Sequence, residues 1–533
     1  MPTTRFKRFA NLYKDSVTLM QVAAHLRGRD GIEQASCLMA TPANLAQLRD
    51  ADLEIGTEAA QLSPSDLLVV VRGEPAACDA ALAAAEAALE SAGGGSAGGA
   101  AAAFELPLGS IALGVERAGM ADLALISVPG DYAAAEARKA LALGLHVMLF
   151  SDNVSIDDEC TIKTFARERG LLVMGPDCGT AIVNGVPLGF ANVVRRGDIG
   201  LVAASGTGLQ EVTCRIHNEG GGVSQALGTG GRDLKEAIGG ITMLQGLEAL
   251  AADSATRVIV LISKPPAPDI ARRIEAAARA AGKPVVVHFL GAPAQSPQPP
   301  HAPPGHVVTA HSLRHAADSA LALARGERVP EPLQTLPAAL RAAVDQRSAT
   351  LAASQHAVRA LFTGGTFCYE AQLAFLARGL ACRSNAPAPG ATPFDEHRDA
   401  FAGHVFLDLG EDEYTRGRPH PMIDPELRNA AVRAQGAAGD IAVILFDVVL
   451  GYGAHADPAA GLADALADAQ RTARAAGRGL LAIGHVCGTD GDPQGRAAQV
   501  HALEAAGALI AGSNVEAAWL AAHVAQQRAT ARW

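Results

Sequence analysis

The stretch Gly200-Leu-Val-Ala-Ala-Ser-Gly-Thr-Gly-Leu-Gln-Glu211 decides how the chain is interpreted. Four apolar residues, 201–204, are typical of a buried strand, and a helix is expected from Leu209 onward. Glycines at the turn let the backbone approach a ligand, and the first N–H groups of a helix have no partner within it. Because the helix dipole adds partial positive charge there, such a turn readily binds phosphate. A tight turn without a ligand is the alternative, and this stretch alone does not separate the two.

A second stretch follows the same plan later in the chain. Residues 202–211 align without a gap with residues 361–370, so that the Gly-Thr pair and the glutamate coincide. Segments 287–291 and 484–488 each contain a histidine followed three residues later by glycine. We therefore predict two copies of one α/β unit and expect their helix starts to point into a common cleft. Two helix N-termini aimed at one point would hold a phosphoryl group better than one.

Composition limits the class of protein. A chain of 533 residues is long enough for several domains, and its net charge of −11 argues against nucleic acid as a partner. The eight cysteines include no C-x-x-C pair, which favours a reducing cytoplasm over a disulfide framework or a zinc site. The N-terminus lacks an apolar core, and the apolar run 441–450 is too short to span a bilayer. We expect a cytoplasmic protein without a metal site or a membrane partner.

Four domains are expected from the alternation of strands and helices. Residues 1–91 form a small α/β, ferredoxin-like domain, and the following glycine, alanine and serine residues form a flexible linker. Residues 104–195 are Rossmann-like in rhythm but lack the G-x-G-x-x-G fingerprint, so NAD is not supported. Residues 197–327 hold the first repeat and residues 353–533 hold the second.

Two local expectations concern the first domain. Residues 17–20 are expected to begin a strand that passes into a helix near Ala23. His25 and Arg27 are expected on a solvated face of that helix, and a functional role for them is the alternative.

The most polar stretch of the chain, residues 408–425, follows a predicted strand over residues 404–407. Arginines placed where a strand ends, here Arg416 and Arg418, can bind carboxylate or phosphate bidentately. A solvated loop with internal ion pairs is the alternative. The concentration of charge in this one place favours a functional loop.

Several of these stretches together resemble the α subunit of succinyl-CoA synthetase: Met174-Gly-Pro-Asp-Cys-Gly179, residues 200–211 and Gly228-Thr-Gly-Gly-Arg-Asp233. The second repeat resembles the CoA-ligase domain at the end of that enzyme's β subunit. The fused arrangement, with an additional N-terminal domain and the loop 417–425, is similar to the FdrA family. The resemblance implies an α/β fold with a Rossmann-like domain, two flavodoxin-like CoA-ligase domains and a small N-terminal ferredoxin-like domain.

In the synthetase family the two Gly-Thr helices converge on a phosphohistidine, which implies a phosphate site here. Asp177 and Cys178 stand where that family has Asn-Cys-Pro, which implies a role in binding a cofactor. The implied phosphate-binding residues are Ser205, Gly206, Thr207, Gly364, Gly365 and Thr366.

The chain departs from the synthetase in three ways. It has no ATP-grasp domain and no Walker A motif, so we expect no ATP binding by this chain alone. The glycine-rich loop that holds CoA in the first Rossmann-like domain is missing, which leaves CoA open. The segment that carries the phosphohistidine is matched only by the dipeptide Gly305-His306, so we do not expect His306 to be phosphorylated.

A chain that keeps the phosphate-binding turns but lacks the ATP-grasp domain and the glycine-rich CoA loop is suited to phosphate-dependent group transfer. FdrA-type proteins resemble one component of the oxamate carbamoyltransferase of purine and allantoin breakdown, in which carbamoyl-oxamate and phosphate give carbamoyl phosphate and oxamate. The helix starts would then bind phosphate as a substrate, Arg416 or Arg418 would hold the carboxylate of the small organic acid, and His420 would carry a proton. Other protein subunits are implied as partners. Two alternatives stay open: an acyl-CoA synthetase subunit that uses CoA, and a non-catalytic scaffold.

Overall fold

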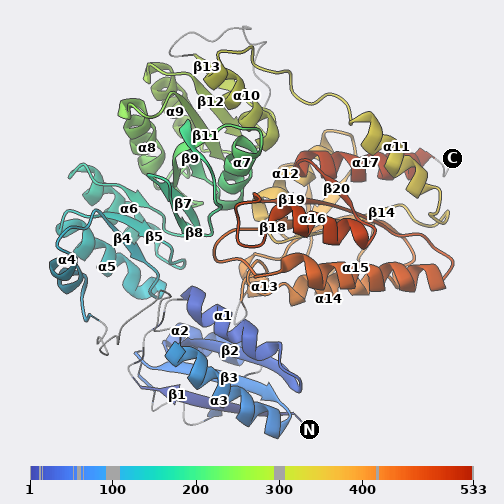
Figure 1. Ribbon diagram of the computed structural model, residues 1–533, viewed down its shortest axis with the longest axis horizontal. Helices are drawn as coiled ribbons and strands as arrows, with labels where there is room; N and C mark the ends of the chain where they lie inside the picture. Colours follow the sequence, from blue (N-terminus) through green and yellow to red (C-terminus); the bar gives the residue numbers. More distant parts are fainter. Residues whose placement is uncertain are drawn as a thin grey trace.

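The computed structural model describes residues 2–10, 12, 14, 16–51, 53, 55–56, 62–63, 65–91, 108–292, 306–415 and 419–530. Within these residues the strands form two three-stranded and two seven-stranded sheets. Figure 1 shows the N-terminal unit in blue, the Rossmann-like unit in teal, and the two larger units in green and in yellow to red. The predicted α/β class, with a Rossmann-like unit, two ligase-like units and a small N-terminal unit, is confirmed.

The N-terminal unit is an antiparallel sheet in the order β1-β3-β2, covered by helices. The prediction of a strand at residues 17–20 is wrong, because these residues belong to a helix. Buried apolar side chains recur there at helical spacing, at Leu19, Val22, Ala23 and Leu26. The first strand lies upstream instead. The elements are β1 (Thr3–Phe9), α1 (Ser16–Arg27), β2 (Ile32–Met39), α2 (Pro42–Asp50), β3 (Leu67–Gly73) and α3 (Pro75–Ser91).

The Rossmann-like unit has three parallel strands in the order β4-β5-β6, in agreement with the Rossmann-like rhythm expected for residues 104–195. The hairpin that follows, β7 (Thr180–Val183) and β8 (Val186–Gly189), pairs instead with the sheet of the first ligase-like unit. The elements of the Rossmann-like unit are α4 (Ile111–Ala118), β4 (Leu123–Ile126), α5 (Gly130–Ala142), β5 (His146–Leu149), α6 (Ile156–Arg167) and β6 (Val173–Met174).

The first ligase-like unit has the strand order β13-β12-β11-β9-β10-β7-β8, in which the hairpin pairs antiparallel and the other strands are parallel. The central strand leads into a helix through the Ser-Gly-Thr turn. The elements are β9 (Arg196–Ala204), α7 (Gly206–Asn218), β10 (Val223–Gly228), α8 (Ile241–Ala252), β11 (Val258–Ser263), α9 (Pro268–Ala280), β12 (Val285–Phe289), β13 (Val307–Thr309) and α10 (Leu313–Arg325).

The second ligase-like unit has the parallel strand order β16-β15-β17-β14-β18-β19-β20. Its central strand also leads into a helix through a Gly-Thr turn. The elements are α11 (Ala338–Ser348), β14 (Ala357–Phe362), α12 (Gly365–Leu376), β15 (Cys382–Ser384), β16 (Thr392–Pro393), β17 (His404–Asp408), α13 (Asp412–Thr415), α14 (Glu426–Ala434), β18 (Ile441–Val449), α15 (Pro458–Ala475), β19 (Leu481–Cys487), α16 (Arg496–Ala505), β20 (Leu509–Ala511) and α17 (Asn514–Thr530).

The two ligase-like units share one hydrophobic core. Helices α7 and α10 of the first unit pack against α12 and α17 of the second, and Figure 1 shows α7 and α12 where the two units meet. The largest cluster of buried side chains accordingly includes Leu209 and Val212 of α7 together with Phe367 and Phe375 of α12. Since apolar burial is the main favourable term in association, this shared core fixes how the two repeats face each other.

The glutamates that the two repeats have in common both reach into the other repeat. Glu211 Oε2 lies 2.7 Å from His485 Nε2, and both side chains are 4% exposed. Burial opposes ionisation of both groups, but their mutual attraction lowers the pKa of Glu211 and raises the pKa of His485. Glu370 Oε1 accepts the N–H group of Leu313, at the start of α10, at 2.9 Å. The two repeats are therefore joined by buried polar contacts as well as by apolar packing.

The substitution Glu211→Gln should lower the free energy of unfolding by roughly 3 kcal/mol, because His485 would then be buried without its charged partner. Glu219→Gln is the control, since the Glu219 side chain is exposed and lies 3.6 Å from Arg215, and ion pairs of exposed carboxylates contribute little. Denaturant unfolding at pH 6 measures both variants. Equal losses in the two variants would contradict a special role for the buried pair.

The pH of that measurement follows from the signs of the two shifts. A lowered glutamate pKa stabilises the fold above the ordinary value of about 4.3, and a raised histidine pKa stabilises it below the ordinary value of about 6.5. The contribution of the pair is therefore complete between these values. It declines as the pH rises through the pKa of His485 or falls through that of Glu211.

Candidate functional site

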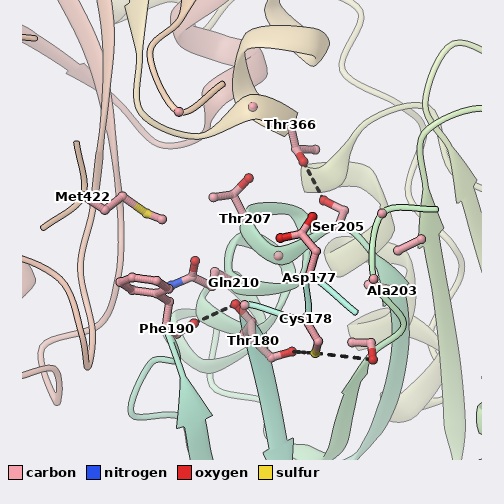
Figure 2. Close-up of a pocket in the computed structure, with 18 of the residues that line it drawn as sticks. Asp177, Cys178, Thr180, Phe190, Ala203, Ser205, Thr207, Gln210, Thr366 and Met422 are labelled. Atoms are coloured by element: carbon pink, nitrogen blue, oxygen red, sulfur yellow. Dashed lines mark hydrogen bonds between the residues drawn. The ribbon is translucent and has the colours of Figure 1, made fainter. Parts of the chain in front are cut away.

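The starts of α7 and α12 meet, as expected from the repeat. Ser205 Oγ and Thr366 Oγ1 share a hydrogen bond at 2.6 Å, and Figure 2 shows the two hydroxyl groups turned toward each other. Ser205 also caps α7, because its Oγ accepts the N–H group of Gly208 at 3.0 Å. Among the described residues, the N–H groups at positions 206, 207, 365 and 366 have no hydrogen-bond acceptor. Four backbone donors thus remain at the junction of the two helix starts.

These donors lie at a cavity of about 290 Å³. Its walls come from the ends of parallel strands and the loops after them, where ligands bind in open α/β sheets. Figure 2 shows Phe190 and Met422 on one side of the cavity, with Asp177 near its centre. The side chains with ionisable groups in the lining are Asp177, Cys178, Lys264, Asp408, Glu411 and His420.

The two helix starts differ in the groups that already occupy them. At α12, Asp447 accepts the N–H groups of Thr363 and Gly364, each at 2.7 Å. Asp408 lies beside Gly365, where a Cβ atom would come within 2.4 Å of Asp408 Oδ2, so a larger residue at this position would displace the Asp408 carboxyl group. At α7, by contrast, the cap is the neutral Ser205 hydroxyl. An added anion therefore meets less repulsion at α7 than at α12.

Asp408 ends strand β17 and is buried. Burial raises its pKa to about 7, and Glu411 adds to the shift while Lys264 opposes it. Asp408 Oδ1 accepts the N–H group of Gly410 at 3.0 Å. The side chain can therefore change its protonation state near neutral pH. Sequence reasoning placed Asp408 in the polar loop but gave it no role.

Lys264 directly follows β11, and its ammonium group lies 5.5 Å from the centre of the Tyr369 ring. Among the described residues of the cavity lining it is the only lysine or arginine, and it forms no ion pair with a described residue. Sequence reasoning did not assign it. The available signal was its place, because a lysine that follows a buried parallel strand lies at the edge of the sheet where ligands bind.

His420 lies in the cavity wall, as the hypothesis for this residue requires. The N–H group of Met422 donates to its Nδ1 at 3.2 Å, so the neutral ring carries its hydrogen on Nε2. Burial lowers the pKa of His420 to about 4. A ring kept neutral in this way is suited to donate a hydrogen bond, as in other sites where an imidazole acts without charge.

Asp177 and Cys178 both border the cavity but differ in what they present to it. The Cys178 thiol lies 3.5 Å from the carbonyl oxygens of Thr180 and Gly228, and burial raises its pKa to about 12. The thiol is therefore a packed structural group. Desolvation, together with the neighbouring Asp152, raises the pKa of Asp177 to about 6.

The loop after β10 is held by a buried ion network. Lys163 Nζ donates to Glu159 at 2.9 Å, to Asp233 at 2.7 Å and to the Thr229 carbonyl oxygen at 3.0 Å. Asp233 in turn accepts the N–H groups of Thr242 and Met243. These charges are satisfied inside the protein, so they fix the loop against the Rossmann-like unit.

None of the remaining candidate residues is found among the described residues of the cavity lining. Arg416 and Arg418 lie outside the described residues. Gly364 does not line the cavity, and its N–H group donates to Asp447. His306 precedes β13, where its carbonyl oxygen accepts the N–H group of Val285 at the first residue of β12. It therefore lies at the opposite end of the parallel strands from the cavity, and the absence of a phosphohistidine there stays a prediction.

The polar loop is tied to the first domain. Arg27, expected on a solvated face, instead forms an ion pair with Asp424 at 2.5 Å, and both side chains are largely buried. Asp424 Oδ1 also accepts the N–H group of Glu426, the first residue of α14. The loop thus combines exposed charges with charges that hold its end in place.

Known families match three parts of the chain. AllF, heavy metal-associated domain, matches residues 1–104; CoA binding domain matches residues 194–291; and CoA-ligase matches residues 361–524. The chain is 42% identical over 512 residues to the uncharacterized protein YahF of Escherichia coli (strain K12), and the alignment covers 96% of each protein. The chain belongs to the FdrA family.

More distant relatives extend the likeness of this FdrA-family chain. It is 31% identical over 194 residues to the succinate–CoA ligase [ADP-forming] subunit alpha-2, mitochondrial, of Trichomonas vaginalis. That alignment covers 35% of this chain and 60% of the ligase subunit. The same subunit from Staphylococcus epidermidis is 25% identical over 150 residues, or 48% of its length. The chain therefore spans about half the length of these ligase subunits.

A solved structure gives a weaker likeness. The apo form of the dinucleotide-forming acetyl-coenzyme A synthetase 1 of Ca. Korarchaeum cryptofilum aligns with 77% of this chain and 84% of its own, at 15% identity and a TM-score of 0.31. The family models and the ligase subunits, by contrast, show that the FdrA-family chain is a member of the succinyl-CoA synthetase-like CoA-ligase superfamily with an AllF-related first domain.

Two further findings concern metals and membranes. Within the described part of the chain, no group of three or more His, Cys, Asp or Glu side chains is placed to hold a metal ion. Among the same residues, no helix has the length and apolar character needed to cross a bilayer.

His420 should stay neutral from pH 5 to pH 8, because its pKa is about 4. In nuclear magnetic resonance of histidine-labelled protein, one of the imidazole signals that titrate below pH 5 should be missing from the His420→Gln variant, which assigns it to His420. A midpoint between pH 6 and 7 for that signal would instead make His420 a proton carrier.

Proposed function

We propose that this FdrA-family chain is a subunit that catalyses phosphate-dependent transfer of a carbamoyl or acyl group. The observation that carries the proposal is the meeting of two helix starts, with four unpaired N–H groups, at one small cavity. Such donors bind phosphate and stabilise negative charge that develops during transfer. Lys264 adds a cation at the same cavity.

The finer proposal takes its substrates from the resemblance to oxamate carbamoyltransferase. Carbamoyl-oxamate and phosphate would react to carbamoyl phosphate and oxamate, in a complex with other subunits. Phosphate would lie at Ser205, Gly206 and Thr207, on the less acidic side of the cavity. The Nε2–H group of His420 would donate to the organic substrate.

The size of the cavity supports small substrates. Small-molecule pockets span roughly 300–1,000 Å³, and a volume of about 290 Å³ suits phosphate together with a small organic acid. A second candidate is an acyl-CoA ligase-like reaction, favoured by the matches to CoA binding domain and CoA-ligase. In that case most of CoA would lie outside this cavity.

Calorimetry with phosphate, carbamoyl phosphate and CoA tests the proposal. Phosphate and carbamoyl phosphate should bind, and Lys264→Met should weaken both by about ten- to a hundredfold, because one charge-assisted hydrogen bond contributes roughly 1.5–3 kcal/mol. Lys235→Met is the matched control, since Lys235 is exposed and outside the cavity lining. Binding of CoA alone would favour the ligase, and binding of none of the three would favour a scaffold.

Arg416 and Arg418 are proposed to bind the carboxylate of the organic acid. In the reconstituted complex, Arg416→Ala and Arg418→Ala should each raise the KM for the organic acid by about ten- to a hundredfold. Thr207→Val should mainly raise the KM for phosphate. If both arginine variants behave like the wild type, the acid is bound elsewhere.

A further inference from the structure

We propose that Asp408 is the group that transfers the proton in the reaction of this cavity. The inference rests on the proposed function and adds a residue to it. It goes beyond the role considered for His420, because it gives the two side chains separate tasks.

The position of Asp408 suits proton transfer. It lies at the carboxyl end of β17, it lines the cavity, and its side chain is buried. Oδ1 is fixed by the N–H group of Gly410 at 3.0 Å. Oδ2 lies against Gly365, where the missing side chain of glycine lets the carboxyl group reach the start of α12. The carboxyl group therefore borders the place where the two helix starts converge.

The surroundings of Asp408 keep the pKa of its carboxyl group near neutral pH. Glu411 from its own loop and Asp447 from β18 disfavour the charged form, whereas Lys264 from β11 and the Gly410 N–H group favour it. His420 is neutral and changes this balance little. Burial outweighs the favourable contacts and raises the pKa to about 7. A bound phosphate dianion would raise it further, so the group enters the reaction as an acid.

The other carboxyl groups are less suited. Asp447 does not line the cavity, and its two oxygens already accept three donors from Thr363 and Gly364. The Glu411 side chain is exposed to solvent. Asp177 also lines the cavity and has a raised pKa of about 6, which makes it the competing candidate that an experiment must separate from Asp408.

The step balances without another reactant. An oxygen of hydrogen phosphate forms a bond to the carbamoyl carbon, and the bond from that carbon to the departing nitrogen breaks. Asp408 in its acid form gives its proton to that nitrogen, and the proton of hydrogen phosphate returns to the Asp408 carboxylate. Charge and hydrogen count are therefore equal on both sides, and Asp408 ends in the form in which it began.

The substitution Asp408→Asn in the reconstituted complex tests the inference. The kcat for carbamoyl phosphate formation should fall at least about a hundredfold, as for loss of a general acid. Phosphate binding should persist or tighten, because a carboxyl group beside α12 is removed. Asp408→Glu should recover part of the rate. Asp412→Asn is the matched control, since Asp412 is exposed in the same loop and does not line the cavity.

Two further readouts separate a proton carrier from a structural carboxyl group. The wild-type kcat should decline only above pH 7, because bound phosphate raises the pKa of Asp408 beyond its value of about 7 in the free protein, and the remaining rate of Asp408→Asn should lack that decline. A raised carboxyl pKa destabilises the fold as the pH rises from the ordinary value, about 3.9, to the folded value. The variant should therefore gain in Tm over the wild type between pH 4 and pH 7, so loss of rate would not reflect unfolding.

The outcomes are distinct. If Asp408→Asn keeps more than a tenth of the wild-type kcat with the same pH dependence, the inference is overturned while the proposed function stands. If Asp177→Asn abolishes the decline at high pH and Asp408→Asn does not, the proton carrier is Asp177 and the inference also fails. If the wild type binds neither phosphate nor carbamoyl phosphate, the proposed function fails and the inference fails with it.

Discussion

The meeting of two helix N-termini is the constraint on which the rest of the site depends. Each N-terminus carries partial positive charge, so two of them pointing at one place repel each other. The chain offsets this repulsion with the Ser205–Thr366 hydrogen bond, with Asp447 and Asp408 at the start of α12, and with the shared core behind the helices. An anion in the cavity would offset it further. The same arrangement that costs stability when empty thus gives the site its affinity for phosphate in the proposed function.

The glutamate and histidine that recur in both repeats make different contacts in each repeat. His485 donates to Glu211, whereas the corresponding histidine, His288, has a buried Nε2 without a partner. Burial lowers the pKa of His288 to about 4, so that ring is neutral. Glu370, for its part, contacts Leu313 and Asn514, and burial raises its pKa to about 7. One carboxylate–imidazole pair is therefore charged, and its counterpart has been replaced by neutral contacts.

The sequence predicted what is local and repeated. The strand–turn–helix units at Ser205 and Gly364 follow from a short apolar run before a Gly-Thr pair, and their alignment predicted that they face each other. Lys264 and Asp408 could not be found in this way, because they are single residues from different sheets that tertiary packing brings to one cavity. The prediction of a strand at residues 17–20 was wrong for a related reason. Four residues taken alone fit a strand, and the helix is recognised only from apolar positions that recur over a longer segment.

The first domain contacts the polar loop that contributes His420 to the cavity wall. The Arg27–Asp424 ion pair joins α1 to the end of the loop, and the second oxygen of Asp424 holds the first turn of α14. Ile423 and Asp424 donate their N–H groups to the carbonyl oxygen of His420, and Met422 donates to its ring. The position and tautomer of His420 therefore depend on a turn whose end is fixed by the N-terminal domain. This domain belongs to a family named for heavy metals, yet the contact that ties it to the site is an arginine–carboxylate pair.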